Sequence, residues 1–504
     1  MRPFYENLPF FTIFLPLLCG VASAAIRDGK KAYRLTLISA AAVAVLSAAL
    51  LYFVYTQDVS FTYTMGRFAA PYGNAVKAGP WQALLCTMFA VVMGLSLLGG
   101  GHSLFHDILP EKQGLYFVMA NMTLAGLLAL VYTNDMFTAY VFIEITTISA
   151  CAMVMAKDTG PNLIATIRYL FMSLLGSGLF LIGLTLLNSI AGYLLMEPLA
   201  KAVAILAELG KFHRPLIVSM GLMTVGLGIK GAMFPFHLWL PDAHGGTTTA
   251  SSAILSGLVL KGYIALLVTL MLRVFGLELM RRTGLCNVLL VLGLLGMIFG
   301  SLAAMREYHV KRMLANSSVA QIGYIFMGLG LGTEAGVAAA CFHVLVHAAC
   351  KPLLFICAGR LSTVSGHHRS LKNLRGSAYR DVAAGVGFTV GAMSMIGIPL
   401  LGGFVSKLYL SRAAVDSPAV AAVLLTIAVS TVLNALYYVP AVLAIWVRPP
   451  WDEVHLILRS VKPEDLKFDR SFFTAAAALT VLIVLLGIVY HPILNVIRAG
   501  IRLM

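Results

Sequence analysis

The feature that most constrains this chain is a succession of apolar runs, each long enough to cross a lipid bilayer as a helix. A spanning helix needs about 20 mostly apolar residues, and the bilayer interior tolerates only backbone that satisfies its own hydrogen bonds. The sequence therefore predicts an all-α, polytopic membrane protein with about 14 transmembrane helices. The predicted helices lie near residues 8–26, 34–56, 80–100, 114–132, 134–156, 162–189, 215–235, 248–272, 285–304, 312–332, 335–359, 380–410, 418–446 and 471–490.

The composition and the placement of charge agree with that prediction. Hydrophobic residues make up 60% of the 504 positions and charged residues only 11%, whereas soluble domains carry about 25% charged residues. The net charge of +15 is not gathered in a basic helix or stripe that could follow a phosphate backbone. It lies in the short gaps between apolar runs, as topological charges do in membrane proteins. We therefore expect the lipid bilayer as a partner and no nucleic acid.

Two connections between the apolar runs are long and polar, but neither is large enough to form a soluble domain. They cover residues 190–214, where a short interfacial helix is predicted, and residues 447–470, which contain three prolines. We therefore expect a single transmembrane domain over residues 1–504.

The distribution of Lys and Arg among the gaps predicts the orientation of the chain. Cytoplasmic loops of membrane proteins carry an excess of positive charge. That excess is found in the gap at Arg306, Lys311 and Arg312, in the 360–380 loop and in the 447–470 connection. We therefore expect these loops in the cytoplasm and the N-terminus outside.

Several ionisable side chains fall inside the predicted helices. A charge at the centre of a spanning helix costs about 2.5–3.5 kcal/mol on insertion scales, so such a group pairs, meets water or performs a function. A single lysine near a helix end can snorkel to the interface, and a single histidine can be a satisfied core residue. This many such groups in one chain instead favour an ion path. The set comprises Glu144, Lys230, Lys261, His343, His347, Lys351 and Lys407.

These residue types suit the movement of protons. A free lysine has a pKa near 10.4 and holds its proton too firmly to release it. Burial and a neighbouring cation lower the pKa of a lysine, and a nearby carboxylate raises it. A change of about two to three pKa units, at 1.36 kcal/mol each, matches the roughly 3.5 kcal/mol needed to move one charge against about 150 mV. We therefore interpret Glu144 and Lys230 as a switching pair.

The two histidines and the lysine that follows them are spaced four residues apart. His343, His347 and Lys351 therefore share one helix face, and neutral histidines can relay protons near pH 7. A histidine pair with this spacing can also bind zinc, but no third ligand lies nearby in the sequence. The seven cysteines contain no CxxC spacing, so we expect no metal site and no cofactor in this chain.

Two of the predicted helices contain clusters of helix-breaking residues. Such breaks free backbone groups and admit water and polar side chains. Kinks that serve packing alone are the alternative. The breaks stand five helices apart, which predicts two five-helix repeats, about 114–272 and 285–446, with the helices at 8–26, 34–56, 80–100 and 471–490 at the periphery. Paired breaks in two halves indicate an ion site. The clusters are Gly226, Gly228, Gly231 and Pro235 around Lys230, and Gly397, Pro399, Gly402 and Gly403 before Lys407.

Long stretches around these residues resemble a known family. They are KGAMFPFHLWLPDAHGGTTTASSAILSGLVLKGY (230–263), VKRMLANSSVAQIGY (310–324), HVLVHAACKPLLF (343–355), GIPLLGGFVSK (397–407) and NDMFTAYVFIEITTISA (134–150). The family is that of the antiporter-like membrane subunits shared by respiratory complex I, Mrp-type cation/proton antiporters and energy-converting membrane-bound hydrogenases. The likeness covers nearly the whole chain. It implies fourteen helices, with the two five-helix repeats inverted and helices 7 and 12 broken.

The resemblance also implies roles for the ionisable residues. It places Glu144, Lys230, Lys261, His343, His347 and Lys407 on a central hydrophilic axis with half-channels to either side. Glu144 and Lys230 take the family positions on helices 5 and 7, and Lys407 takes the terminal position on helix 12. Arg168, His237 and His244 are accessory candidates. One departure concerns the loop after Asp242, where PDAM followed by Pro-Thr-Pro is usual and this chain reads PDAH followed by Gly-Gly-Thr-Thr-Thr.

The segment GRFAAPYGNAVKAGPWQALL (66–85) favours the Mrp and hydrogenase branch. The resemblance then implies a proton-translocating subunit of an energy-converting [NiFe]-hydrogenase or a related ferredoxin-linked complex, in a bacterial or archaeal cytoplasmic membrane. Its partners would be other membrane subunits and a peripheral redox arm, and the chain would hold no redox centre. Several alternatives stay open: a redox-independent Mrp-type Na⁺/H⁺ antiporter, a proton-pumping subunit of an NADH-quinone oxidoreductase, a quinone-binding subunit and a solute transporter.

Overall fold

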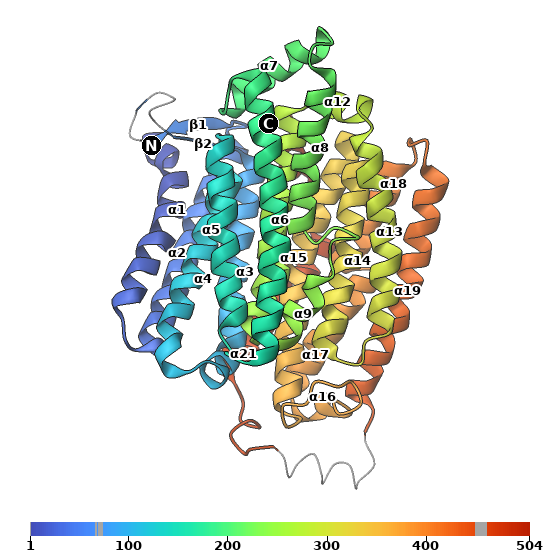
Figure 1. Ribbon diagram of the computed structural model, residues 1–504. Coiled ribbons are helices and arrows are strands. Elements are labelled where there is room, and N and C mark those ends of the chain that lie inside the picture. Colours follow the sequence, from blue (N-terminus) through green and yellow to red (C-terminus); the bar gives the residue numbers. More distant parts are fainter. Residues whose placement is uncertain (1, 66–67, 69–73, 449–460) are drawn as a thin grey trace.

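The computed structural model describes residues 2–65, 68, 74–448 and 461–504. It is a bundle of long helices that run side by side, with both termini at one end (Figure 1). The long helices are α1 (Arg2–Ala25), α2 (Gly29–Thr56), α3 (Pro80–Asp107), α4 (Pro110–Tyr132), α5 (Met136–Met155), α6 (Gly160–Ala191), α8 (His213–Lys230), α13 (Leu285–Met305), α14 (Val310–Gly330), α15 (Glu334–Thr363), α19 (Val420–Trp446) and α21 (Arg470–Ile488).

The helical tracts expected from the apolar runs are all found as helix. The tract expected near 248–272 is a composite of α10 (Thr249–Ile254), η2 (Leu255–Val259), α11 (Leu260–Thr269) and η3 (Leu270–Val274), in which η2 and η3 are π-helical. Among the described residues, 11 helices are long and apolar enough to cross a membrane. The prediction of a helical, multi-span membrane protein is therefore confirmed, while the total of fourteen spans and the two repeats stay predictions.

Local sequence sets the start of several helices. Helices α3 and α4 begin with Pro80 and Pro110, where the missing backbone N–H leaves no hydrogen bond unmade. Helix α5 begins after Asp135, whose carboxylate accepts a hydrogen bond of 2.7 Å from the Thr138 backbone N–H. Asp381 caps the start of α17 (Val382–Ile396) in the same way. Such caps satisfy backbone donors that the first helical turn leaves free.

Both predicted helix breaks are present. Helix α8 ends at Lys230, and the next helix, α9 (Trp239–Gly246), begins after an irregular stretch. Helix α17 ends at Ile396, and α18 (Gly402–Ala414) begins after a short irregular stretch of its own. Gly397 has a φ of +101°, a conformation that glycine adopts without a steric penalty. The first break follows Lys230 directly, and Lys407 lies within α18 with its side chain reaching back to the second break.

Small residues allow the helices of the second half to pack closely. Helices α13 and α14 lie against each other over their length. A Cβ added at Gly293 would lie 2.4 Å from the Met327 backbone nitrogen, and one at Gly323 would lie 2.6 Å from the Met297 nitrogen. Such contacts between backbones need glycine and are typical of membrane helix pairs. The packing holds α14 and its polar residues in the interior.

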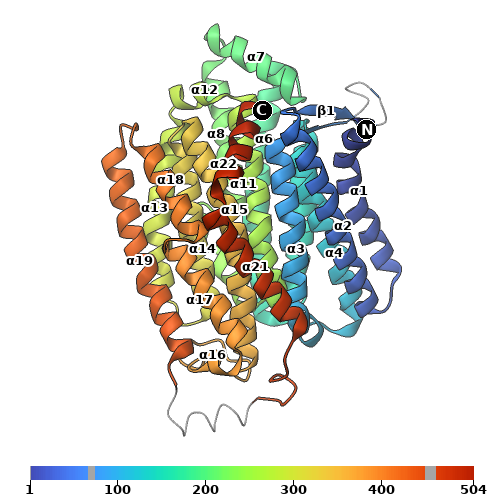
Figure 2. The same cartoon turned by 180° about the vertical axis from the view of Figure 1, so that it is seen from behind.

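Several shorter elements lie between and after the long helices. Strands β1 (Phe61–Thr64) and β2 (Ala75–Ala78) form an antiparallel pair with Phe61 opposite Ala78. The interfacial helix predicted within 190–214 is found as α7 (Met196–Glu208). A further helix, α22 (Tyr490–Arg502), follows the last predicted one and packs on α15 and α3 (Figure 2). Two short helices, α12 (Leu277–Arg282) and α16 (Ser377–Arg380), lie in connections.

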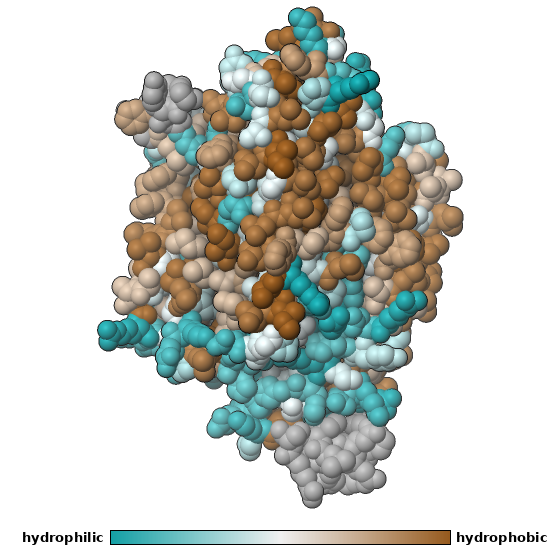
Figure 3. All heavy atoms as spheres, viewed as in Figure 1, coloured by the Kyte–Doolittle hydropathy of each residue, from teal (hydrophilic) through white to brown (hydrophobic). Residues whose placement is uncertain are grey.

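The surface of the bundle differs between its flanks and its ends. Hydrophobic side chains cover the flanks of the helices, and hydrophilic ones gather at the end that carries α16 (Figure 3). That end also carries the 360–380 loop, for which the sequence predicts a cytoplasmic location. Part of the 447–470 connection, residues 449–460, and most of 66–73 lie outside the described residues.

Candidate ion path

The acid–base pair expected between Glu144 and Lys230 is present. The Lys230 Nζ lies 3.9 Å from the Glu144 Oε1, and it donates a hydrogen bond of 2.7 Å to the Thr147 hydroxyl on α5. Thr147 also lies 3.2 Å from the Tyr263 hydroxyl, and the Tyr263 ring faces the ammonium at 5.4 Å. The pair is therefore loose, because the lysine hydrogen-bonds to the hydroxyl rather than to the carboxylate.

Glu144 differs from the expectation of a deeply buried carboxylate. Its side chain is 23% exposed on the outside of the chain, whereas that of Lys230 is 1% exposed. Phe137, Val141 and Ile148 on the same helix are also exposed. Glu144 stands near the middle of α5, so this face presents part of a carboxylate at mid-membrane depth.

The helix that carries Lys261 has an irregular backbone. Lys261 is fully buried, and its Nζ donates a hydrogen bond to the Ser256 carbonyl within the π-helical turn η2. A second π-helical turn, η3, follows α11. Such turns are frequent at functional sites. Lys261 lies within electrostatic range of His343, His347 and Lys351 on α15.

The histidines of α15 connect this region to Lys407. The rings of His343 and His347 are nearly parallel, with centroids 6.3 Å apart. The His343 Nδ1 lies 2.8 Å from the Ser406 hydroxyl on α18. The adjacent Lys407 donates hydrogen bonds of 2.7 Å to the Ile396 carbonyl and 3.2 Å to the Thr431 hydroxyl. The carbonyl belongs to the end of α17 at the break, so the interrupted helix supplies an acceptor for the buried lysine.

Lys351 and His244 lie beside this line. The Lys351 Nζ donates to the Leu314 carbonyl at 2.9 Å, the Ser317 hydroxyl at 2.8 Å and the Tyr438 hydroxyl at 3.2 Å. His244 is fully buried, its ring stacks on Phe355 at 4.7 Å, and neither ring nitrogen has a hydrogen-bond partner among the described residues. His244 also lies within electrostatic range of Lys261 and Lys351. The altered loop sequence therefore still brings this histidine next to the path residues.

The lysines all point into the bundle. Exposed fractions are 1% for Lys230, 0% for Lys261 and Lys351, and 6% for Lys407. A lysine that snorkels keeps its ammonium at the interface, which these four do not do. Lys230 and Lys261 hydrogen-bond to different partners, the Thr147 hydroxyl and the Ser256 carbonyl.

The other two accessory candidates lie away from this line. Arg168 is 61% exposed and forms an ion pair with Asp242. Asp242 also accepts a hydrogen bond of 2.8 Å from Arg312, which pairs with Glu307. His237 is 7% exposed and lies in the break after α8. Arg168 therefore pairs with α9 at the surface and is not among the buried basic residues.

Replacing Asp242 by Ala is expected to lower the stability of the protein. The substitution leaves Arg168 and Arg312 facing each other without the carboxylate that joins them, and partly exposed pairs of this kind contribute up to about 1 kcal/mol each. Thermal unfolding of the purified protein in detergent measures the change. Asp416→Ala is the control, because Asp416 is exposed and forms no ion pair among the described residues. Equal unfolding temperatures for the two variants would contradict this role.

Several buried polar residues beside the candidate path residues were not predicted from the sequence. The pattern of charges in the sequence places Lys311 in a cytoplasmic gap between two predicted helices. In the structure, α14 begins at Val310 and leaves Lys311 only 3% exposed. The hydroxyl groups that hold the lysines carry no charge, so a search for ionisable residues passes over them. Thr147 lies three residues after Glu144 and so on the same face of α5, a spacing that could have identified it. The other hydroxyl residues are Tyr263, Ser317, Ser406, Thr431 and Tyr438.

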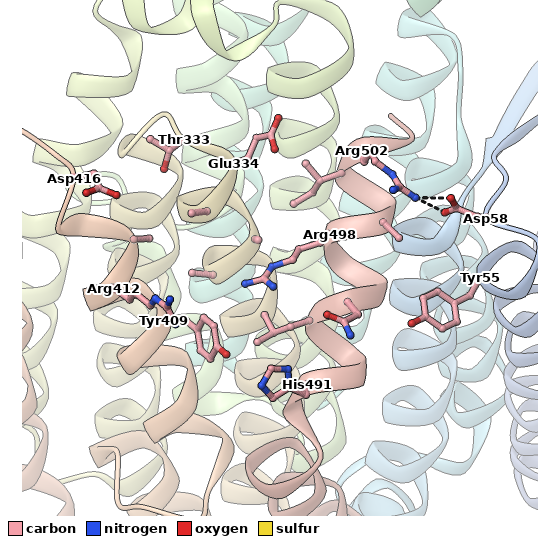
Figure 4. A pocket seen from close by; sticks show the side chains of 18 residues that line it. Tyr55, Asp58, Thr333, Glu334, Tyr409, Arg412, Asp416, His491, Arg498 and Arg502 are labelled. Atoms are coloured by element: carbon pink, nitrogen blue, oxygen red, sulfur yellow. Dashed lines mark hydrogen bonds and ion pairs between the residues drawn. The ribbon is translucent and has the colours of Figure 1, made fainter.

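A wide pocket lies at the end of the bundle that carries the termini. Its volume is about 1100 Å³, and α2, α15, α18 and α22 form its walls. Arg412 and Arg498 point into it from α18 and α22 (Figure 4). It is also lined by Ala339, which precedes His343 by one turn of α15. The pocket therefore approaches the histidine and Lys407 group from the side opposite α16.

The described residues contain no group of three or more His, Cys, Asp or Glu side chains that could hold a metal ion. The residues described above for the candidate path carry amines, imidazoles, hydroxyls and one carboxylate. These groups bind and release protons or hydrogen-bond to water.

Comparison with known proteins relates the site to a known architecture. A family model described as "NADH:quinone oxidoreductase/Mrp antiporter, TM" matches residues 133–434, a range that contains every predicted path residue. NADH-quinone oxidoreductase subunit N of Desulforudis audaxviator is 30% identical over 438 residues, which is 86% of this chain and 85% of that protein. A Na(+)/H(+) antiporter subunit of Alkalihalophilus pseudofirmus is 29% identical over 437 residues, with 85% of each chain covered.

Among solved structures, a chain of the membrane-bound sulfane sulfur reductase, an archaeal respiratory membrane complex, superposes with a TM-score of 0.85. The two chains are 25% identical, and the match covers 99% of this chain and 98% of the other. The architecture around the lysines is thus similar to that of a subunit from a multisubunit membrane complex.

Proposed function

The chain belongs to the family of membrane subunits shared by NADH:quinone oxidoreductases and Mrp antiporters, and we propose that it moves protons across the membrane through its buried basic residues. The observation that supports this most directly is the inward orientation of Lys230, Lys261 and Lys407, each at an irregular or interrupted backbone. Buried cations are costly in a membrane, and so many of them in one interior are explained by an ion path.

In this proposal the proton passes between groups that the structure holds close together. Glu144 lies near Lys230 without a hydrogen bond to it. A shorter distance between them favours the protonated lysine, and a longer one favours release of the proton. The parallel rings of His343 and His347 then lie between Lys261 and Lys407. Each imidazole accepts a proton on one nitrogen and releases one from the other.

The opposite ends of this line give the proposed route a direction through the membrane. Lys407 and His343 lie near the wide pocket at the terminal end, which is the predicted outer side. His244 and Lys311 lie toward the end that carries α16. In the proposed route a proton therefore passes between Lys311, at the start of α14, and Lys407, beside the break between α17 and α18.

We further propose that this chain works beside other membrane subunits. The face that exposes Glu144, Phe137, Val141 and Ile148 presents a carboxylate at mid-membrane depth, where contact with acyl chains is unfavourable. A neighbouring subunit that covers this face would remove that cost. A peripheral redox arm, as in an energy-converting hydrogenase or a related ferredoxin-linked complex, is the proposed energy source.

The second candidate function is that of a subunit in a redox-independent Na⁺/H⁺ antiporter. The observation that favours it is the similarity to the Na(+)/H(+) antiporter protein of Alkalihalophilus pseudofirmus, which is nearly equal to that to the NADH-quinone oxidoreductase protein. The two functions differ in the energy source that drives proton movement across the membrane. An electron donor drives it in one case, and a sodium gradient in the other.

The experiment uses the intact complex in sealed vesicles with a dye that reports internal pH. We expect acidification on addition of electron donor and none on imposing a sodium gradient alone. Lys407→Met should reduce the rate at least about tenfold, because a thioether cannot carry a proton. The control is Lys201→Met, since Lys201 is an exposed lysine on α7. A Lys407→Met rate equal to that of the unmodified complex would refute the path.

A further inference from the structure

A small polar cavity lies at the end of the bundle opposite the termini. Its volume is about 130 Å³, and it is bounded by the last turns of α3, the first turn of α14, the end of α15 and the loop after it. One water molecule occupies about 30 Å³ in the liquid, so several can enter. The end that holds it carries the 360–380 loop, for which the sequence predicts a cytoplasmic location.

The outer wall of the cavity contains three histidines, two of which face the carboxylate of Asp465. Asp465 is 4% exposed and lies 3.5 Å from His367 Nε2 and 3.9 Å from His102 Nε2. The rings of His367 and His106 stack at 4.8 Å and 10°. The side chains of the three histidines are between 41% and 46% exposed, so they meet water while Asp465 is enclosed beneath them.

Further charged groups surround this cluster from each neighbouring element. On α3, Asp107 lies 3.2 Å from His106 Nδ1. From the connection after α5, Lys157 pairs with Asp107 at 3.1 Å. Arg369, on the same loop as His367, also lines the cavity, and its Nη1 donates to the Gly245 carbonyl at 2.8 Å. The carboxylates of Asp107 and Asp465 therefore face three basic side chains, because Lys311 also lines the cavity.

The inner wall is formed in part by Lys311, the buried lysine that the sequence pattern assigns to a loop. Its Nζ donates a hydrogen bond of 3.0 Å to the Thr247 carbonyl. Thr247 follows the buried His244 by three residues, and the His244 ring stacks on Phe355 of α15. One face of the cavity thus meets water, and the other leads toward the path residues.

His367 lies in a loop outside the spanning helices and is able to accept protons. Burial lowers the pKa of His367 from its usual 6.5, and the nearby Asp465 carboxylate acts in the opposite direction. The imidazole is therefore mostly neutral at pH 7, with a free nitrogen lone pair. A neutral imidazole beside an enclosed carboxylate is suited to brief, reversible protonation.

We propose that this cavity is a proton-loading site, at which His367 and its neighbours around Asp465 collect protons from the aqueous phase and Lys311 passes them inward. The inference rests on the proposed function. In the loading step a neutral imidazole takes a proton from hydronium, which becomes water, and the imidazole becomes imidazolium. The imidazolium then passes the proton through cavity water to the neutral Lys311 amine, which becomes ammonium, and the imidazole is neutral again.

The test replaces His367 by Gln, which keeps a hydrogen-bonding side chain of similar size but cannot be protonated near neutral pH. Proton translocation by the intact complex is measured from pH 6 to pH 9 in inverted vesicles, where the predicted cytoplasmic face meets the medium. We expect rates close to those of the unmodified complex at pH 6 and about tenfold lower at pH 9, where free protons are scarce. Added imidazole buffer should restore the rate at high pH.

The control is His368→Gln, which changes the adjacent exposed histidine that does not line the cavity. Its pH profile should match that of the unmodified complex. The loading site is refuted if His367→Gln has an unchanged profile, or if it loses activity equally at every pH without rescue by imidazole. Lys407→Met separates this outcome from failure of the proposed function. If the unmodified complex moves protons and Lys407→Met does not, an unchanged His367→Gln profile counts against the loading site alone.

Discussion

Replacing Lys230 by Ala is expected to abolish proton translocation while the complex still assembles. Lys230 is 1% exposed, lies 3.9 Å from the Glu144 carboxylate and donates to the Thr147 hydroxyl. Alanine leaves no group there that can bind a proton, so the pair can no longer switch. The rate of acidification in vesicles measures transport, and the yield of intact complex on a native gel measures assembly.

A second variant separates loss of transport from loss of folding. Removing one member of a buried ion pair costs about 3–5 kcal/mol, because the remaining charge lacks its partner. Glu144 is partly exposed, so the cost here should be smaller. Lys230→Ala combined with Glu144→Gln removes both charges and should restore any lost assembly without restoring transport. Transport by either variant at the unmodified rate would show that this pair is not the switch.

The sequence was sufficient to predict the fold and to select the candidate path residues, because both predictions depend on residue types that lipid makes costly. Apolar runs predict helices with little ambiguity when the solvent is a bilayer. Charged residues inside those runs can be recognised from the sequence as candidate functional groups, because a buried charge is costly in lipid. The breaks at Lys230 and Lys407 are predicted by clusters of glycine and proline and are present, and the family resemblance drawn from the motifs is confirmed.

What the sequence could not supply depends on distances between helices. Lys311 stands beside Arg312, and only the position of α14 relative to α9 and α15 shows that one is buried and the other pairs with Asp242. The cluster around Asp465 joins residues from α3, the loop after α15 and the segment before α21. No local pattern relates these segments, because their contacts arise only when the bundle is closed.

The partial exposure of Glu144 is a further feature that could not be predicted from the sequence. The periodicity of α5 does not distinguish a face that meets lipid from a face that meets another subunit, because both are apolar. Only the arrangement of the helices shows that Glu144 lies between Lys230 on the inside and an apolar outer surface. The charge of Glu144 therefore predicts a buried position, whereas the arrangement of the helices leaves its side chain partly exposed at the outer surface.

Replacing Gly403 by Ala is expected to impair both stability and transport strongly. A Cβ at this position would lie 1.7 Å from the carbonyl oxygen of Ser394. That oxygen is part of the α17 backbone, so it cannot rotate away as a side chain would. Overpacking of this kind typically costs about 1–3 kcal/mol. Movement of α18 would also displace Lys407 from the Ile396 carbonyl, which it contacts at 2.7 Å.

Thermal unfolding in detergent and translocation in vesicles measure the two effects, and two other glycines provide the controls. A Cβ at Gly402 would meet only side chains, Leu486 and Val346, at 3.1 Å, so Gly402→Ala should be milder. A Cβ at Gly178 on α6 would meet nothing within 4 Å, and alanine is favoured over glycine in a helix by about 1 kcal/mol. Gly178→Ala should therefore leave transport unchanged and slightly raise stability. If Gly403→Ala behaved like Gly178→Ala, the close contact between α17 and α18 would not position Lys407, and the break would have no part in holding the path.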